Sequence, residues 1–183
     1  MIFELIKNRR SAFPVQYNEV PISKADIEEL LEAANWAPNH KKTEPWRFKV
    51  LQGASKDKLG TFLVEKYRQI EEFPKDFKCK KLMENPKRSS AIIAICMQRD
   101  PKESIPEWEE IAAVAMAVQN MWLLCTEKGI GSYWSSPGLI KYMDEFFDLS
   151  EGEKCLGFFY MGYSDEELPE GIRTSIEDKV TWL

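Results

Sequence analysis

The sequence predicts a domain that contains both helices and strands, and three segments carry this prediction. Residues 91–97 form a continuous apolar run rich in β-branched side chains, which is typical of a strand buried on both faces. Residues 107–128 repeat apolar side chains at helical spacing, and Gly129 follows where a helix commonly ends. Ser23 can cap a helix that has the same periodicity. A length of 183 residues fits one domain, or one domain with extended arms.

Shorter helices are expected around these segments. Residues 2–8 fit a short amphipathic helix with three apolar side chains turned inward, Phe3, Leu5 and Ile6. Ser55 is expected to cap a further helix, and Pro137 to open another, because proline is favoured at the first helical position. Residues 69–89 are charged and contain two prolines, so they are interpreted as a variable excursion with a little helix in the middle.

Three further strands complete the prediction. Residues 46–51 alternate apolar and charged side chains, which indicates a strand with one buried face. Residues 132–134 form a short strand after the long helix, and residues 155–161 form the last strong one. Strands therefore alternate with helices along the chain rather than forming one all-β block.

The last segment, residues 163–183, is predicted to be an arm. Its apolar residues are too widely spaced to build a core of their own: Ile172, Ile176, Val180 and Trp182. They must be buried against the main domain or against a partner subunit, because exposed apolar groups of this size are unfavourable in water.

Composition and charge exclude several classes of protein. The net charge is −5 and no long basic run is present, which argues against general nucleic-acid binding. No apolar stretch approaches the length of a membrane span, and the N-terminal apolar run is too short for a signal peptide. The four cysteines form no CxxC pair and there is one histidine, so no metal site is expected. A cytoplasmic protein with reduced thiols is predicted.

Common catalytic motifs are missing. There is no P-loop, no GxSxG and no HExxH, and Gly129-Ile130-Gly131 lacks the third glycine of a dinucleotide-binding loop. A serine triad would have to use His40, the only histidine. Hydrolase and nucleotide-phosphate functions therefore lose most of their support.

Three segments carry groups suited to a flat, anionic cofactor. Arg9-Arg10-Ser11 supplies two guanidinium groups and a hydroxyl, as a phosphate dianion requires, although solvated cations at a helix C-terminus explain the segment equally simply. Pro38-Asn39-His40 offers amide and imidazole donors, or is a helix-ending turn with a surface histidine. Trp134-Ser135-Ser136 places an aromatic ring and two hydroxyls before a helix, or is an ordinary serine cap.

Taken together and in order, these segments resemble the nitroreductase family of FMN-dependent oxidoreductases, and its short members in particular. The resemblance covers residues 3–183 and rests on six separated blocks: Arg-Arg-Ser, Leu-Leu-Glu-Ala-Ala-Asn-Trp-Ala-Pro-Asn-His, Glu-Pro-Trp-Arg-Phe, Ala-Val-Gln-Asn-Met-Trp-Leu-Leu, Lys-Gly-Ile-Gly-Ser-Tyr-Trp and Leu-Gly-Phe-Phe-Tyr-Met-Gly-Tyr. It implies a single α+β domain, residues 1–183, in which helices surround a central, mostly antiparallel mixed sheet. It also implies an interlocked homodimer whose arm, about residues 163–183, crosses to the partner.

The resemblance assigns a role in FMN binding to ten residues. One subunit is expected to hold the phosphate and ribityl groups with Arg9, Arg10 and Ser11, and the other to reach FMN with Pro38, Asn39 and His40. Trp134, Ser135 and Ser136 match the segment along the isoalloxazine, and Arg173 resembles a C-terminal basic residue that pairs with the phosphate. Glu109 is interpreted as a solvated carboxylate at a helix start.

The function implied by the resemblance is hydride transfer from NADH or NADPH through FMN to a nitroaromatic, quinone or similar small acceptor, with ping-pong kinetics. The flavin carries this chemistry, so no side chain is assigned as catalytic. Two alternatives stay open: a flavin-binding or redox-sensing dimer without significant turnover, and a cofactor-free interaction domain.

Overall fold

A four-stranded antiparallel sheet lies at the centre of the computed structural model, which describes residues 1–183. Its strands are β1 (Trp46–Leu51), β2 (Ala91–Gln98), β3 (Ile130–Ser135) and β4 (Glu153–Tyr163), in the order β1-β2-β4-β3. All three strand pairings within the chain are antiparallel. The expected mostly antiparallel sheet is therefore present, and no parallel pair of a mixed sheet occurs within the chain. The central strand β2 is buried along its first seven residues, as its unbroken apolar sequence predicts.

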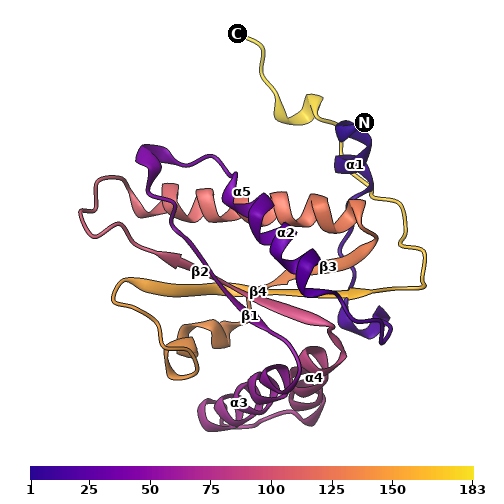
Figure 1. Ribbon diagram of the computed structural model, residues 1–183, viewed down its shortest axis with the longest axis vertical. Coiled ribbons are helices and arrows are strands. Elements are labelled where there is room, and N and C mark those ends of the chain that lie inside the picture. The colour runs from indigo at the N-terminus through magenta and orange to yellow at the C-terminus, as the bar shows by residue number, and fades with distance from the viewer.

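Helices cover both faces of this sheet (Figure 1). α5 (Glu107–Glu127) and α2 (Lys24–Asn35) pack on one face, where Ile93, Ile95 and Phe159 meet Val114, Val118 and Met121. α3 (Ala54–Ile70), α4 (Asp76–Arg88) and the 3₁₀ segment η3 (Gly138–Glu145) cover the other, where Leu59, Leu63 and Met143 pack with Phe158 and Tyr160. The result is an α+β fold with two apolar cores, one on each side of the sheet.

Several helix ends follow the sequence. Ser23 caps α2, because its Oγ accepts a hydrogen bond from the Asp26 N–H at 3.0 Å. Gly129 follows α5 at φ +69°, a conformation that glycine adopts without strain. Ser55 does not cap α3; Gly53 does, at φ +53°. Pro137 precedes η3 as its cap instead of occupying the first helical position.

The excursion at residues 69–89 was predicted wrongly, because most of it is the helix α4. Its buried side folds onto α3 through residues spaced i, i+3, i+4 and i+7: Cys79, Leu82, Met83 and Pro86. Pro86 lies in the final turn, so the hydrogen bond that it cannot donate is lost only near the end of the helix.

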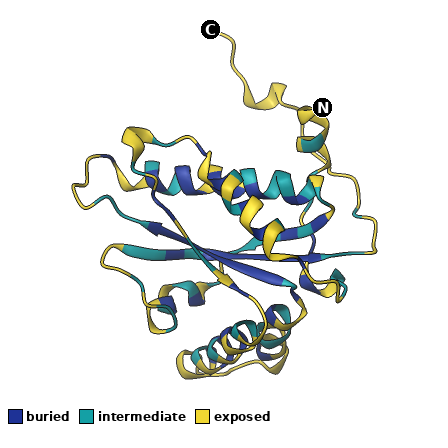
Figure 2. Cartoon of the chain, in the orientation of Figure 1, coloured by how far each residue is buried: buried dark blue, intermediate teal, exposed yellow.

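Both ends of the chain leave apolar groups exposed. α1 (Ile2–Asn8) has no buried residue, and the inward placement expected for Phe3 and Ile6 is wrong within one chain. The arm runs from the end of β4 past α1 and then away from the sheet, ending near the short segment η4 (Glu177–Lys179) (Figure 1). Figure 2 shows both ends as exposed, and Trp182 is 93% exposed. No helix combines the length and apolarity that crossing a bilayer requires.

Candidate functional site

Three arginines gather where α1 ends and the arm passes. α1 stops at Asn8, and the backbone becomes extended at Arg9 (φ −60°, ψ 126°); the Arg9 side chain lies against α5, whereas the Arg10 side chain lies against the arm. Arg173 comes from the arm. They line a cavity of about 760 Å³ together with Ile6, Lys7, Asn8, Gln119, Glu170 and Gly171. The sequence expected these arginines to act together, and the structure does bring them together.

Arg9 is the arginine with unused hydrogen-bonding capacity. Its guanidinium lies 4.4 Å from the ring centre of Trp122, and its buried Nη1 has no hydrogen-bond partner. The pKa of Arg9 is lowered, first by burial and then by the nearby charges of Arg173 and Arg10. None of the three arginines forms an ion pair with a carboxylate. A bound dianion would offset the repulsion among the three arginines and accept a hydrogen bond from the unpaired Nη1 of Arg9.

Arg10 holds the backbone of the arm. Its Nε donates to the carbonyl of Pro169 at 2.9 Å, and its Nη1 donates to the carbonyls of Lys7 and Arg9 at 2.5 and 2.9 Å. A Cβ at Gly171 would lie 2.6 Å from the Arg10 Cζ, so a larger residue there would require the Arg10 guanidinium to shift. Ser11, next along the chain, is exposed.

Trp134 lies on the sheet face that α5 covers, as Arg9 and Trp122 do. It packs against the α5-side core, and its neighbour across the strand pair is Phe159, whose ring meets Trp122 edge-on at 5.6 Å. The indole Nε1 donates to the carbonyl of Leu156 at 3.3 Å. Gly157 makes room for this ring, since a Cβ there would lie 2.3 Å from the Trp134 Nε1. After Trp134, Ser135 is half-buried and Ser136 is exposed.

The loop with Pro38, Asn39 and His40 lies at the other end of α5. His40 Nδ1 lies 2.6 Å from Glu109 Oε2, so Glu109 is a half-buried partner of the histidine and not the solvated carboxylate expected. Asn39 Oδ1 accepts from the Glu44 N–H at 3.1 Å. The exposed Pro38 precedes these groups.

The backbone of this loop is strained. Three non-glycine residues within five positions have positive φ angles: Lys41 (53°), Lys42 (55°) and Glu44 (43°). The contacts that hold this conformation include a hydrogen bond from Lys41 Nζ to the Ser104 carbonyl at 2.7 Å. Strain of this kind is characteristic of functional loops, where the surrounding structure fixes an unfavourable geometry.

One chain therefore presents two separate halves of the predicted site. Arg9 rests on Trp122, near the C-terminal end of α5, whereas His40 contacts Glu109 in its first turn. At a rise of 1.5 Å per residue these two positions lie about 20 Å apart along the helix. The structure brings Arg9, Arg10 and Arg173 together in one cavity, but it does not bring Pro38, Asn39 and His40 to them, and Trp134 connects to Arg9 only through Phe159 and Trp122.

Sequence reasoning missed the supporting role of α5. The apolar pattern of residues 107–128 gave Trp122 no functional role, yet its ring supports the Arg9 guanidinium and its Nε1 donates to the Arg10 carbonyl at 3.3 Å. Gln119, one turn earlier, lines the arginine cavity. The available signal was an aromatic and an amide about one helical turn apart on α5.

Comparisons with known proteins agree on one family. The model of the nitroreductase family matches residues 6–163. "Putative NAD(P)H nitroreductase YfhC" of Bacillus subtilis is 30% identical over 97% of this chain and 92% of its own length. A nitroreductase-like family protein from Bacillus cereus has a TM-score of 0.85 at 30% identity, covering 100% of this chain and 96% of its own.

A more distant structure shares the fold. Iodotyrosine deiodinase, solved with FMN and 3-iodo-L-tyrosine bound, has a TM-score of 0.74 at 20% identity and covers 96% of both chains. The family match spans all four strands of the sheet and six of the nine cavity residues; Glu170, Gly171 and Arg173 of the arm lie beyond it. The chain belongs to the nitroreductase family.

Proposed function

We propose that this chain is an FMN-dependent oxidoreductase that uses NADH or NADPH to reduce small electron-poor acceptors such as nitroaromatics or quinones. The observation that carries the proposal is the uncompensated arginine cluster, in which Arg9 keeps a buried donor without a partner. Family membership supports FMN as the group that it binds. For a nitro acceptor, NAD(P)H and one proton give the nitroso compound, NAD(P)⁺ and water.

The residues present fit FMN. Arg9 and Arg173 would hold the phosphate, and Arg10 would keep the arm in place around it. Ser11 and the Trp134-Ser135-Ser136 segment would bind and orient the ribityl and ring portions, because hydroxyl and aromatic groups suit these moieties. When bound, FMN supplies the hydride relay between nicotinamide and acceptor. The chain's own groups bind, orient and exclude water, and none is assigned as an acid or base.

The working unit is a homodimer in this proposal. Pro38, Asn39 and His40 would reach the arginine cavity of a partner subunit, because in their own chain His40 contacts the first turn of α5, about 20 Å along that helix from the Trp122 on which Arg9 rests. Several large apolar side chains are exposed and available for contact between subunits, among them Phe3, Trp36, Trp108, Met116, Ile172 and Trp182. The arm, residues 163–183, would cross to the partner and bury these groups. Four buried, unpaired cysteines suit a reducing cytoplasm.

The direct test is the visible spectrum of the purified protein, with the flavin released by heat, identified and counted. FMN at about one per chain, followed by NAD(P)H oxidation that depends on a nitroaromatic or quinone, is expected. A yellow protein with negligible turnover for every acceptor would favour the alternative of a flavin-binding or redox-sensing dimer. A colourless protein that ignores added FMN would refute the proposal.

A further inference from the structure

A second cavity opens on the face of the sheet opposite the arginine cluster. It has a volume of about 470 Å³ and lies between η1 (Pro14–Gln16), β3 and α4. Its lining combines apolar and aromatic groups with cations: Phe13, Pro14, Val15, Phe77, Tyr133, Lys80, Lys81, Arg88, Glu84 and Asn85. This volume falls within the range of about 300–1,000 Å³ that small-molecule sites occupy.

Aromatic rings form the apolar part of this cavity. Phe13 and Tyr133 lie with ring centres 4.9 Å apart, and Tyr133 stacks on Tyr160 at 5.3 Å. Phe13 is 50% exposed, and Phe77 on α4 is 70% exposed. A flat aromatic ligand would cover rings that water now contacts, which is favourable for both partners.

The charges of the cavity are unbalanced. Lys80, Lys81 and Arg88 face a single carboxylate, Glu84, which gives a formal local charge of +2 in a chain of net charge −5. Glu84 lies 3.1 Å from Arg88 Nη2 and 3.8 Å from Lys80 Nζ, so its charge is shared by two cations. Lys81 has no ion-pair partner. An anionic group would supply the missing negative charge.

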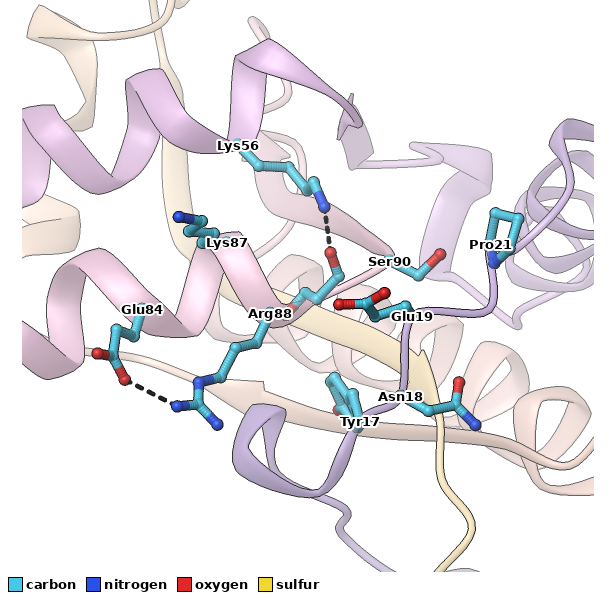
Figure 3. A pocket seen from close by; sticks show the side chains of 10 residues that line it. Tyr17, Asn18, Glu19, Pro21, Lys56, Glu84, Lys87, Arg88 and Ser90 are labelled. Atoms are coloured by element: carbon cyan, nitrogen blue, oxygen red, sulfur yellow. Dashed lines mark hydrogen bonds and ion pairs between the residues drawn. The ribbon is translucent and has the colours of Figure 1, made fainter.

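The neighbouring cavity on the other side of the same helix is different. It is lined by Lys56, Lys87, Arg88 and Glu19 among others and has little apolar surface. Figure 3 shows Lys56 donating to the Ser89 carbonyl and Arg88 directed at Glu84. Glu19 adds a second carboxylate to this neighbouring cavity. The cavity lined by Phe13, Phe77 and Tyr133 is the one that combines exposed rings with an unpaired cation, Lys81.

The aromatic cavity adjoins the segments proposed to hold FMN. Phe13 follows Ser11 by two residues, and the intervening Ala12 N–H donates to the Ser132 carbonyl at 3.1 Å, which fixes the segment to the edge strand β3. Tyr133 is next to Trp134. Burial raises the pKa of Tyr133, while the Ser135 and Asn85 side chains beside it act in the opposite direction. Ser135 therefore links this cavity to the proposed flavin segment.

We infer that this cavity binds aromatic carboxylates, such as nitrobenzoates, at a site separate from the one proposed for FMN. The rings of Phe13, Phe77 and Tyr133 take the aromatic body of the ligand. Lys81, with Lys80 beside it, takes the carboxylate. Neutral analogues of the same shape make the same ring contacts but lack the electrostatic attraction to Lys81 and Lys80.

Equilibrium binding tests the inference without turnover. The FMN-saturated protein is titrated with 4-nitrobenzoate and with 4-nitrobenzamide in the absence of NAD(P)H. The benzoate is expected to bind about threefold to tenfold more tightly, a preference that falls with added salt. Lys81→Gln should remove most of this preference and leave the benzamide unchanged. Phe77→Ser, at an exposed position, should weaken both ligands.

Lys87→Gln is the matched control, because Lys87 lies on the same helix but lines the other cavity. Equal affinities for the two probes, or equal loss in the Lys81 and Lys87 variants, would overturn the inference. Steady-state kcat/KM then separates the two proposals. If binding prefers the benzoate while no acceptor is reduced, the proposed function fails and the carboxylate site stands.

Discussion

Replacing Arg9 with glutamine gives the sharpest test of the arginine cavity. The variant removes a guanidinium whose Nη1 is buried without a partner and whose charge is opposed by Arg173 and Arg10. Hydrogen bonds to charged groups contribute about 1.5–3 kcal/mol, so the dissociation constant for FMN should rise about 10- to 150-fold. Riboflavin, which lacks the phosphate, should bind the variant and the natural protein with similar affinity.

The stability of the apoprotein should change much less. Arg9→Gln loses the contact with Trp122, about 0.5–1 kcal/mol for an exposed cation–π pair. It also removes the repulsion from the other two arginines, which acts in the opposite sense. Because 1 kcal/mol corresponds to roughly 2–4 °C in a chain of this size, the melting temperature without FMN should stay within about 4 °C. A cofactor-specific effect is therefore expected, not general unfolding.

The assay is a flavin fluorescence titration at fixed ionic strength, run in parallel with thermal unfolding of the apoprotein. Arg68→Gln, at an exposed arginine on α3, serves as the control for a simple loss of charge. If Arg9→Gln weakened FMN and riboflavin equally, the assignment of Arg9 to the phosphate would be wrong. If Arg68→Gln weakened FMN as much, net charge would explain the effect and the cavity would not.

Three other predictions concern the scaffold. Glu110→Gln should destabilise the protein by about 3–5 kcal/mol, because Glu110 is 0% exposed and pairs with Arg99, whereas Glu107→Gln at an exposed pair should cost under about 1 kcal/mol; urea unfolding compares them. Removing residues 164–183 should yield a monomer with weak FMN affinity, measured by light scattering and flavin titration. The Asp100 pKa is lowered by hydrogen bonds, chiefly from Ser104, so its contribution to stability is present above the ordinary pKa of aspartate and is lost as pH falls through the depressed folded value. Asp100→Asn should therefore flatten the acid limb of stability measured by urea unfolding.

The sheet and the long helices could be predicted from local patterns because burial is strong and regular there. The apolar run of β2 and the spacing along α5 require no knowledge of distant contacts. α4 was missed because charged residues and Pro86 obscured an apolar stripe of only a few positions. That stripe becomes stabilising only when α3 is in place to cover it, which is a tertiary effect that no local window contains.

The arginine cavity was predictable in its residues but not in its geometry. Arg9 and Arg173 are separated by most of the chain, and no local pattern places the arm beside α1. The support from Trp122 follows from the packing of α1 on α5, and the pairing of His40 with Glu109 follows from the loop conformation. Polar sites depend on such long-range placement, whereas short periodic sequence patterns are enough to predict strands and helices.

In the proposed homodimer, cofactor binding and assembly would be physically coupled. Arg10 fastens the arm through the Pro169 carbonyl, and the same arm brings Arg173 toward Arg9, where the two charges repel. A bound phosphate removes that repulsion and so favours the docked position of the arm, by the same free energy with which the docked arm favours the phosphate. Since the arm also carries Ile172 and Trp182, whose exposed surface needs a partner, docking orders the apolar groups that would join two subunits. In the proposed homodimer, an uncompensated positive cluster at the base of an apolar arm would thus couple subunit association to flavin occupancy, at the cost of a less stable cavity when the phosphate is absent.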